Sequence, residues 1–135
     1  MAEKLKLLVV TAEKKVLDAE ADDVTLPGEM GYLGILPGHA ALITLLKTGV
    51  VSYCNETESE AFALDSGFAE VSNDVVTVLA GVAERRSEID AAAAEQDRAK
   101  AEEEMKSASA ETLDAARARA DLAVARLAVA RGPED

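Results

Sequence analysis

The chain has 135 residues, of which 49% are hydrophobic, and this composition is typical of a folded protein with its own core. The formal net charge of -12 argues against nucleic acid and anionic lipid as direct partners, because both bind through clustered Lys and Arg. Cys54 is the only cysteine, which excludes an internal disulfide and points to a reducing compartment. The most apolar stretch, residues 40–46, contains Thr44 and is far below the ~18 residues of a membrane span, so we expect no direct insertion into lipid.

The first 86 residues have the pattern of short β-strands. Hydrophobic and polar residues alternate around Val24 and Leu26 and again around Phe62 and Leu64. Turn-forming pairs separate the runs, and they are Pro27-Gly28, Pro37-Gly38, Thr48-Gly49, Ser66-Gly67 and Asn73-Asp74. Short strands at this spacing indicate a sandwich or barrel, and no stretch here offers a helix for a parallel crossover. We therefore predict a β-sandwich domain over residues 1–86.

From residue 87 the composition changes to that of helices. Residues 87–131 contain neither Gly nor Pro, and Ala is their commonest residue. We expect Ser87, followed by Asp90 three residues later, to cap a first helix, and Ser109 to cap a second. Gly132 and Pro133 should end that second helix. Because the break near Ser109 is short, residues 87–135 should form an antiparallel two-helix hairpin, which makes the fold mainly β plus α.

The two predicted helices differ in their apolar faces. The second has a regular stripe at spacings of three and four, formed by Leu113, Ala116, Ala120, Ala123, Leu127 and Ala130. In the first, Gln96 and Glu103 interrupt a stripe of Ile89, Ala92 and Ala99. Each buried methylene contributes about 0.8 kcal/mol, so alanine contacts stabilise much less than leucine contacts. The hairpin should be weakly held, and both a poor coiled coil and a detachable arm fit this pattern.

Catalytic and metal-binding motifs are missing from the sequence. The one histidine, His39, has no second His or Cys partner for a zinc site or a nucleophilic triad. Lys47-Thr48 resembles the end of a phosphate-binding loop, but Leu46 stands where the required glycine should be. The carboxylates fall on solvated helix faces without a pocket. We predict a protein that is not an enzyme and that holds no metal or cofactor.

One segment carries a specific pattern, residues 31–44, which read GYLGILPGHAALIT. It resembles the signature of the epsilon subunit of F-type ATP synthases, close to G-x-x-G-I-x-P-G-H-A-P-L, with Ala41 where proline is usual. The resemblance continues in order through LDSGFAEV at 64–71 and VVTVLA at 75–80 to Ile89-Asp90. It therefore covers essentially the whole chain.

The resemblance implies a non-catalytic rotor subunit of the central stalk, which couples proton translocation to ATP synthesis. In that family the sandwich binds the gamma subunit and rests on the ring of c subunits. The hairpin folds against the sandwich or extends along gamma into the alpha/beta head, where it restrains ATP hydrolysis. Carried over to this chain, Glu29, Met30 and Tyr32 should face the c ring, and His39 should lie near gamma. The implied location is peripheral, on the cytoplasmic face of the bacterial inner membrane.

The charges of the hairpin suggest a contact. Residues 88–106 contain seven acidic and three basic residues, a net -4, whereas residues 111–131 contain three acidic residues and four arginines, a net +1. In the family the extended hairpin meets an acidic segment of the beta subunit, and Arg119 and Arg126, on one helix face, could supply that contact. The alternative is local pairing of Arg117 with Asp114 and Asp121.

A second departure from the family concerns nucleotide. Nucleotide-sensing members carry I/L-D-x-x-R-A on the first helix, where the arginine helps to hold ATP. This chain has Ile89 and Asp90, but Ala93 replaces the arginine, so we expect weak or no binding of ATP. That loss disfavours a second hypothesis, an autonomous nucleotide sensor. The long ordered resemblance disfavours a third, a free-standing β-sandwich binding module.

Overall fold

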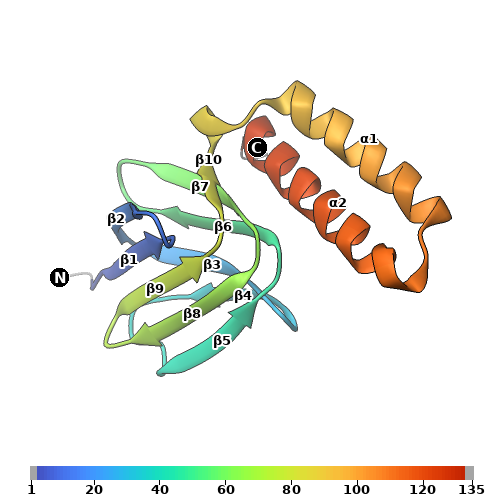
Figure 1. Cartoon of the computed structure of the whole chain (residues 1–135). Coiled ribbons are helices and arrows are strands. Elements are labelled where there is room, and N and C mark those ends of the chain that lie inside the picture. Colours follow the sequence, from blue (N-terminus) through green and yellow to red (C-terminus); the bar gives the residue numbers. More distant parts are fainter. Residues whose placement is uncertain (1–2, 133–135) are drawn as a thin grey trace.

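The computed structural model describes residues 3–132, which form a β-sandwich followed by two antiparallel helices (Figure 1). The strands are β1 (Leu5–Val10), β2 (Lys15–Ala21), β3 (Asp23–Gly28), β4 (Gly31–Ile35), β5 (Leu42–Leu46), β6 (Gly49–Cys54), β7 (Ser59–Leu64), β8 (Gly67–Ser72), β9 (Val75–Ala80) and β10 (Ala83–Arg85). A single 3-10 turn, Arg86–Glu88, leads to helices α1 (Ala91–Ser107) and α2 (Ala110–Arg131). The predicted sandwich with a helical hairpin is confirmed.

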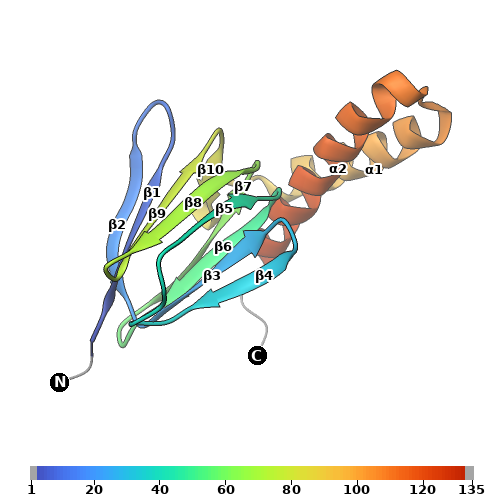
Figure 2. The same ribbon diagram turned by 90° about the horizontal axis from the view of Figure 1, so that it is seen from below.

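The strands lie in two layers (Figure 2). One layer contains β4-β3-β6-β7-β10 and the other contains β5-β8-β9-β1-β2, and a short contact between Gly28 and Leu46 joins β3 to β5. Strands β1 and β9 pair in parallel, and the other pairs are antiparallel. Alternate side chains of both layers point inward and are fully buried, and they include Leu7, Val9, Leu26, Val51, Phe62 and Val78. Burying side chains of this size contributes about 1.5–3 kcal/mol each, which is the main stabilisation of the sandwich.

Most of the predicted turns are found between strands. Asn73 and Asp74 link β8 to β9 with φ of 51° and 64°, the left-handed conformation that these two residue types tolerate. Gly67, at φ 151°, allows β8 to approach β9 so closely that an added Cβ would lie 2.1 Å from the Leu79 carbonyl oxygen.

The turn predicted at Pro27-Gly28 is wrong, because both residues lie within β3 and the chain reverses at Glu29 and Met30. Proline fits in this strand because β3 pairs with β6 over residues 23–25 alone. Beyond Thr25 that edge of the strand needs no ladder donor from Pro27.

The helix starts differ from the prediction in one case. Ser87 is not the cap of α1, because it lies in the 3-10 turn, and Asp90 is the cap: its Oδ1 accepts a hydrogen bond from Ala93 N at 3.1 Å. Asp caps a helix as well as Ser does, and four alanines follow it directly. Ser109 caps α2 as predicted, with its Oγ 3.3 Å from Thr112 N. Gly132, at φ 77°, ends α2, and Pro133 lies outside the described residues.

The helices face each other through alanine. In α2 the predicted stripe is confirmed, since Ala116, Ala120, Ala123 and Leu127 are buried. In α1 the predicted stripe is wrong: Ala92 and Ala99 are exposed, and Ala94 and Ala101 are buried instead. Alanine occurs on several sides of α1, so spacing alone does not select its inner face.

The hairpin touches the sandwich through the C-terminal part of α2, and its far end projects away (Figures 1 and 2). Ala125 and Val129 pack on Ala63 of β7, with Val50 and Ala61 beside them. Within the described residues, neither helix is long and apolar enough to cross a membrane.

Candidate interaction surfaces

Exposed apolar side chains lie on the outer face of the β5-β8-β9 layer. Leu45 pairs directly with Phe68, and Phe68 pairs with Leu79, so the three side chains form a row across three strands, here called the apolar row. Their exposed fractions are 61%, 44% and 36%, and Ile43 on β5 is 72% exposed. A contiguous apolar patch on a folded protein is typical of a surface that a partner covers. The sequence contains a signal that we missed: β5 reads LITLL, which is apolar on both faces.

The three residues expected to face the c ring lie together at the β3–β4 turn. Met30 is 99% exposed at the tip, Glu29 precedes it, and Tyr32 is 61% exposed at the start of β4. The Tyr32 side chain is held against β6, because its Oη accepts a hydrogen bond from Val50 N at 3.2 Å. The turn thus presents an apolar thioether and a phenol ring on a rigid base.

His39 lies at the other end of β4, in the loop that leads to β5. It is exposed, and its Nδ1 lies 2.7 Å from the carbonyl oxygen of Ala40. Gly38 N donates to Asp74 Oδ1 at 2.8 Å, which ties this loop to the β8–β9 turn. The structure therefore separates His39 from Met30 by the length of β4, so the two predicted contacts belong to different surfaces.

The two predicted contact arginines of α2 pair with glutamates of their own chain. Arg119 pairs with Glu104 of α1, within the hairpin. Arg126 pairs with Glu84 of β10 through two hydrogen bonds, 2.6 Å from Nε to Oε1 and 3.3 Å from Nη2 to Oε2. Both arginines line a groove of about 210 Å³ between the helices. Neither of the local pairs considered for Arg117 forms among residues 3–132.

The region of the degenerate ATP motif is occupied by contacts within the chain. The Asp90 carboxylate is used as the cap of α1, and Ala93 is exposed at the first turn. Arg98, the nearest guanidinium along α1, pairs with both Glu95 and Glu102. The contact holds the pKa of Glu95 below its usual range. In the described part of the chain, no three His, Cys, Asp or Glu side chains are grouped as a metal site would require.

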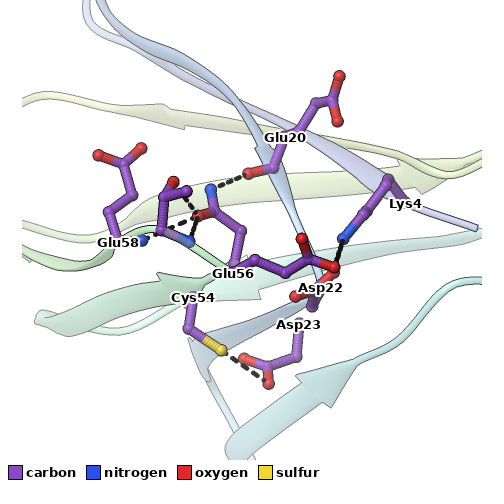
Figure 3. Close-up of polar contacts among 9 residues, drawn as sticks. Lys4, Glu20, Asp22, Asp23, Cys54, Glu56 and Glu58 are labelled. Carbon is purple, nitrogen blue, oxygen red and sulfur yellow. Dashed lines mark hydrogen bonds and ion pairs between the residues drawn. The ribbon is translucent and has the colours of Figure 1, made fainter. Parts of the chain in front are cut away.

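Acidic side chains gather at the end of the sandwich where β2 meets β3 and β6 meets β7 (Figure 3). Lys4 pairs with Asp22, and the Cys54 thiol donates to Asp23 Oδ2 at 3.1 Å, which raises the pKa of the thiol. Asn55 accepts hydrogen bonds from the backbone of Thr57 and Glu58 and so closes the β6–β7 turn. These contacts are structural, because each polar group is used to hold a turn or a strand end.

Comparison with known proteins identifies the family. A model of the ATP synthase delta/epsilon chain β-sandwich domain matches residues 4–86. The ATP synthase epsilon chain of Citrifermentans bemidjiense is 48% identical over 95 residues, which cover 70% of this chain and 69% of that protein. The chain belongs to the family of ATP synthase epsilon chains. The epsilon chain of Koribacter versatilis is 49% identical over 96 residues, or 71% of this chain and 68% of that protein.

Solved structures of mitochondrial ATP synthases share the fold of this epsilon chain. A chain in the Euglena gracilis OSCP/F1/c-ring structure matches 95% of it with a TM-score of 0.83 and 19% identity, over 81% of that chain. A chain of the Tetrahymena thermophila central stalk and c ring matches 64% of it with a TM-score of 0.53 and 17% identity, over 70% of that chain. Epsilon chains are non-catalytic subunits of ATP synthase, so the expectation that the protein is not an enzyme is confirmed by its family.

Proposed function

We propose that this epsilon chain is a rotor subunit of the central stalk of a bacterial ATP synthase, on the cytoplasmic face of the inner membrane. There it couples proton translocation to ATP synthesis, and its hairpin restrains ATP hydrolysis. Relatives named epsilon chain and a fold shared with a chain of a central stalk and c-ring complex support this role. The observation that carries it is the apolar row, since a stalk subunit must be held firmly by its neighbours.

The apolar row is the proposed contact with gamma. Three large side chains in one line present a continuous apolar surface, with no charged residue between them. Covering such side chains contributes up to about 1.5–3 kcal/mol each, enough to anchor an interface. His39 lies in the loop that precedes β5, at the opposite end of that strand from Leu45, so its expected place near gamma is a separate proposal that the row does not support.

The test replaces Leu45 and Phe68 by glutamate. Both side chains point outward, so the sandwich should fold as before, while binding of purified gamma should weaken by about a hundredfold or more. Val124→Glu is the matched control, because Val124 is a 51% exposed apolar residue on α2, away from the row. Unchanged gamma binding by the double variant would exclude the row as the interface.

The β3–β4 turn is the proposed contact with the c ring. Met30 projects fully into solvent, whereas Tyr32 is braced against β6. A Met30→Cys variant in a Cys54→Ser background carries a single thiol, which should cross-link to c subunits in the assembled enzyme. Cross-linking to gamma alone would contradict this assignment.

The hairpin is the proposed regulatory arm, and it acts on the alpha/beta head when extended. Arg119 and Arg126 are the residues we propose to meet an acidic segment there. Replacing both by alanine should raise ATP hydrolysis and leave stalk assembly intact, because each charge-assisted pair lost costs about 1.5–3 kcal/mol. ATPase rates of the assembled enzyme measure this effect. Unchanged hydrolysis, in a complex whose unmodified form is inhibited, would indicate that these arginines only form ion pairs within their own chain.

A further inference from the structure

The contact between hairpin and sandwich is small and lies at one end of α2. Its apolar part consists of Ala125 and Val129 against Ala63, with the partly buried side chains of Val50, Ala61 and Ile89 beside them. Half of these side chains are alanines, so the contact buries a modest apolar area. The rest of the hairpin makes few contacts with the strands and projects outward (Figure 1). Something other than apolar packing must therefore contribute much of the attachment.

Two guanidinium groups flank this apolar contact. Arg126 of α2 holds Glu84 of β10 through both carboxylate oxygens, and their side chains are 26% and 27% exposed. Arg86, in the 3-10 turn, donates from Nε to the Ala130 carbonyl oxygen at 3.1 Å. That oxygen belongs to the last turn of α2, where the helix dipole favours a cation.

Gly132 makes room for the second contact. It ends α2 with φ 77°, and a Cβ at this position would lie 3.0 Å from Arg86 Nη1. A glycine therefore serves two purposes here, since it adopts the left-handed conformation and lets the guanidinium reach the helix end. Glu84 and Arg86 directly precede the link to α1, so both contacts sit at the hinge of the hairpin.

We propose that the Glu84–Arg126 and Arg86–Ala130 contacts form an ionic clasp that holds the hairpin on the sandwich. The Glu84–Arg126 pair is partly buried and has two charge-assisted hydrogen bonds, and the exposed Arg86–Ala130 hydrogen bond adds to it, so the polar contacts strengthen a modest apolar contact. Because the fork of Arg126 is occupied by Glu84, this arginine becomes available to an acidic partner protein only when the clasp opens. This last step rests on the proposed function of the hairpin, whereas the clasp itself does not.

The clasp is tested in the isolated full-length chain by fluorescence energy transfer. Dyes are attached through Glu13→Cys in the β1–β2 turn and Ser107→Cys at the far end of α1, in a Cys54→Ser background. Both sites are exposed. Glu84→Gln and Arg126→Gln should each increase the open population about tenfold or more, as the loss of a charge-assisted contact requires. High salt should open the unmodified hairpin as well.

Two further variants make the result specific. Glu104→Gln removes the Glu104–Arg119 pair, which lies within the hairpin, and should leave the distance between the dyes unchanged. Exchanging the charges, Glu84→Arg with Arg126→Glu, should restore the closed form. A Glu84→Gln chain with the same distance distribution as the unmodified chain would overturn the clasp, as would an equal effect of Glu104→Gln.

Assembled ATP synthase tests the availability of Arg126 separately. Glu84→Gln opens the clasp and keeps Arg126, which can then reach the head, so the rate of ATP hydrolysis should fall. Arg126→Gln also opens the clasp but removes the group that the head would bind, so it should not lower the rate of hydrolysis. If both variants open the hairpin but lower hydrolysis equally, Arg126 is not the group that the head recognises. If both open it and neither changes hydrolysis, the proposed restraint fails while the clasp stands.

Discussion

Single side chains in this protein are used by the fold in ways that a motif search does not reveal. Asp90 belongs to a nucleotide motif by sequence, yet its carboxylate accepts a hydrogen bond from Ala93 N and caps α1. Arg98 similarly serves Glu95 and Glu102. The missing arginine at position 93 was visible in the sequence, whereas these pairings depend on helix ends and rotamers and were not.

Mg-ATP should therefore bind the isolated chain weakly or not at all. A phosphate group needs positively charged donors, and Ala93 offers none, while Asp90 and Glu95 add repulsion near the same turn. Titration calorimetry measures the affinity directly. A dissociation constant below about 1 mM would contradict this expectation if binding disappears in Asp90→Asn or Arg98→Gln. It would mean that these residues hold nucleotide by another arrangement.

At the scale of the elements, the alternation of hydrophobic and polar residues predicted the strands. The predictions that were wrong concern features set by residues distant in the sequence. Pro27 is tolerated in β3 because β6 does not pair with that part of the strand. The inner face of α1 is set by contact with α2, since alanine spacing by itself leaves several faces equivalent. The partner of Arg126 lies 42 residues earlier, in β10, so no local pattern could have revealed it.

The cap of α2 is an element-scale feature with a measurable contribution. Ser109 and Thr112 exchange hydrogen bonds, 3.3 Å from Thr112 N to Ser109 Oγ and 3.0 Å from Ser109 N to Thr112 Oγ1. Ser109→Ala should destabilise the hairpin by about 0.5–2 kcal/mol. Thermal unfolding followed by helical circular dichroism measures the loss. Ser107→Ala is the control, because the Ser107 hydroxyl has no hydrogen bond within residues 3–132, and an equal loss in both variants would contradict a capping role.

At the scale of the whole molecule, the two parts have separate cores. The sandwich core contains residues from β1 to β10, whereas the second cluster is small and contains the junction with α2. The two parts could be separated in the sequence by composition. The strength of their attachment could not be predicted, because it depends on where Glu84 and Arg86 meet the end of α2.

Residues 1–86 should accordingly fold and function without the hairpin. Removing residues 87–135 exposes Ala63 and leaves Glu84 and Arg86 solvated, but every member of the main core remains. We expect cooperative unfolding of the fragment, with a loss of a few kcal/mol at most in the free energy of unfolding, equivalent to a Tm decrease of about 4–8 °C for each kcal/mol.

Gamma should still bind the fragment, because the apolar row lies on β5, β8 and β9, in the layer that the hairpin does not cover. Calorimetric unfolding and a gamma pull-down measure the two properties independently. A fragment that unfolds without cooperativity would mean that α2 completes the sandwich core, whereas a folded fragment that fails to bind gamma would place part of that interface on the hairpin.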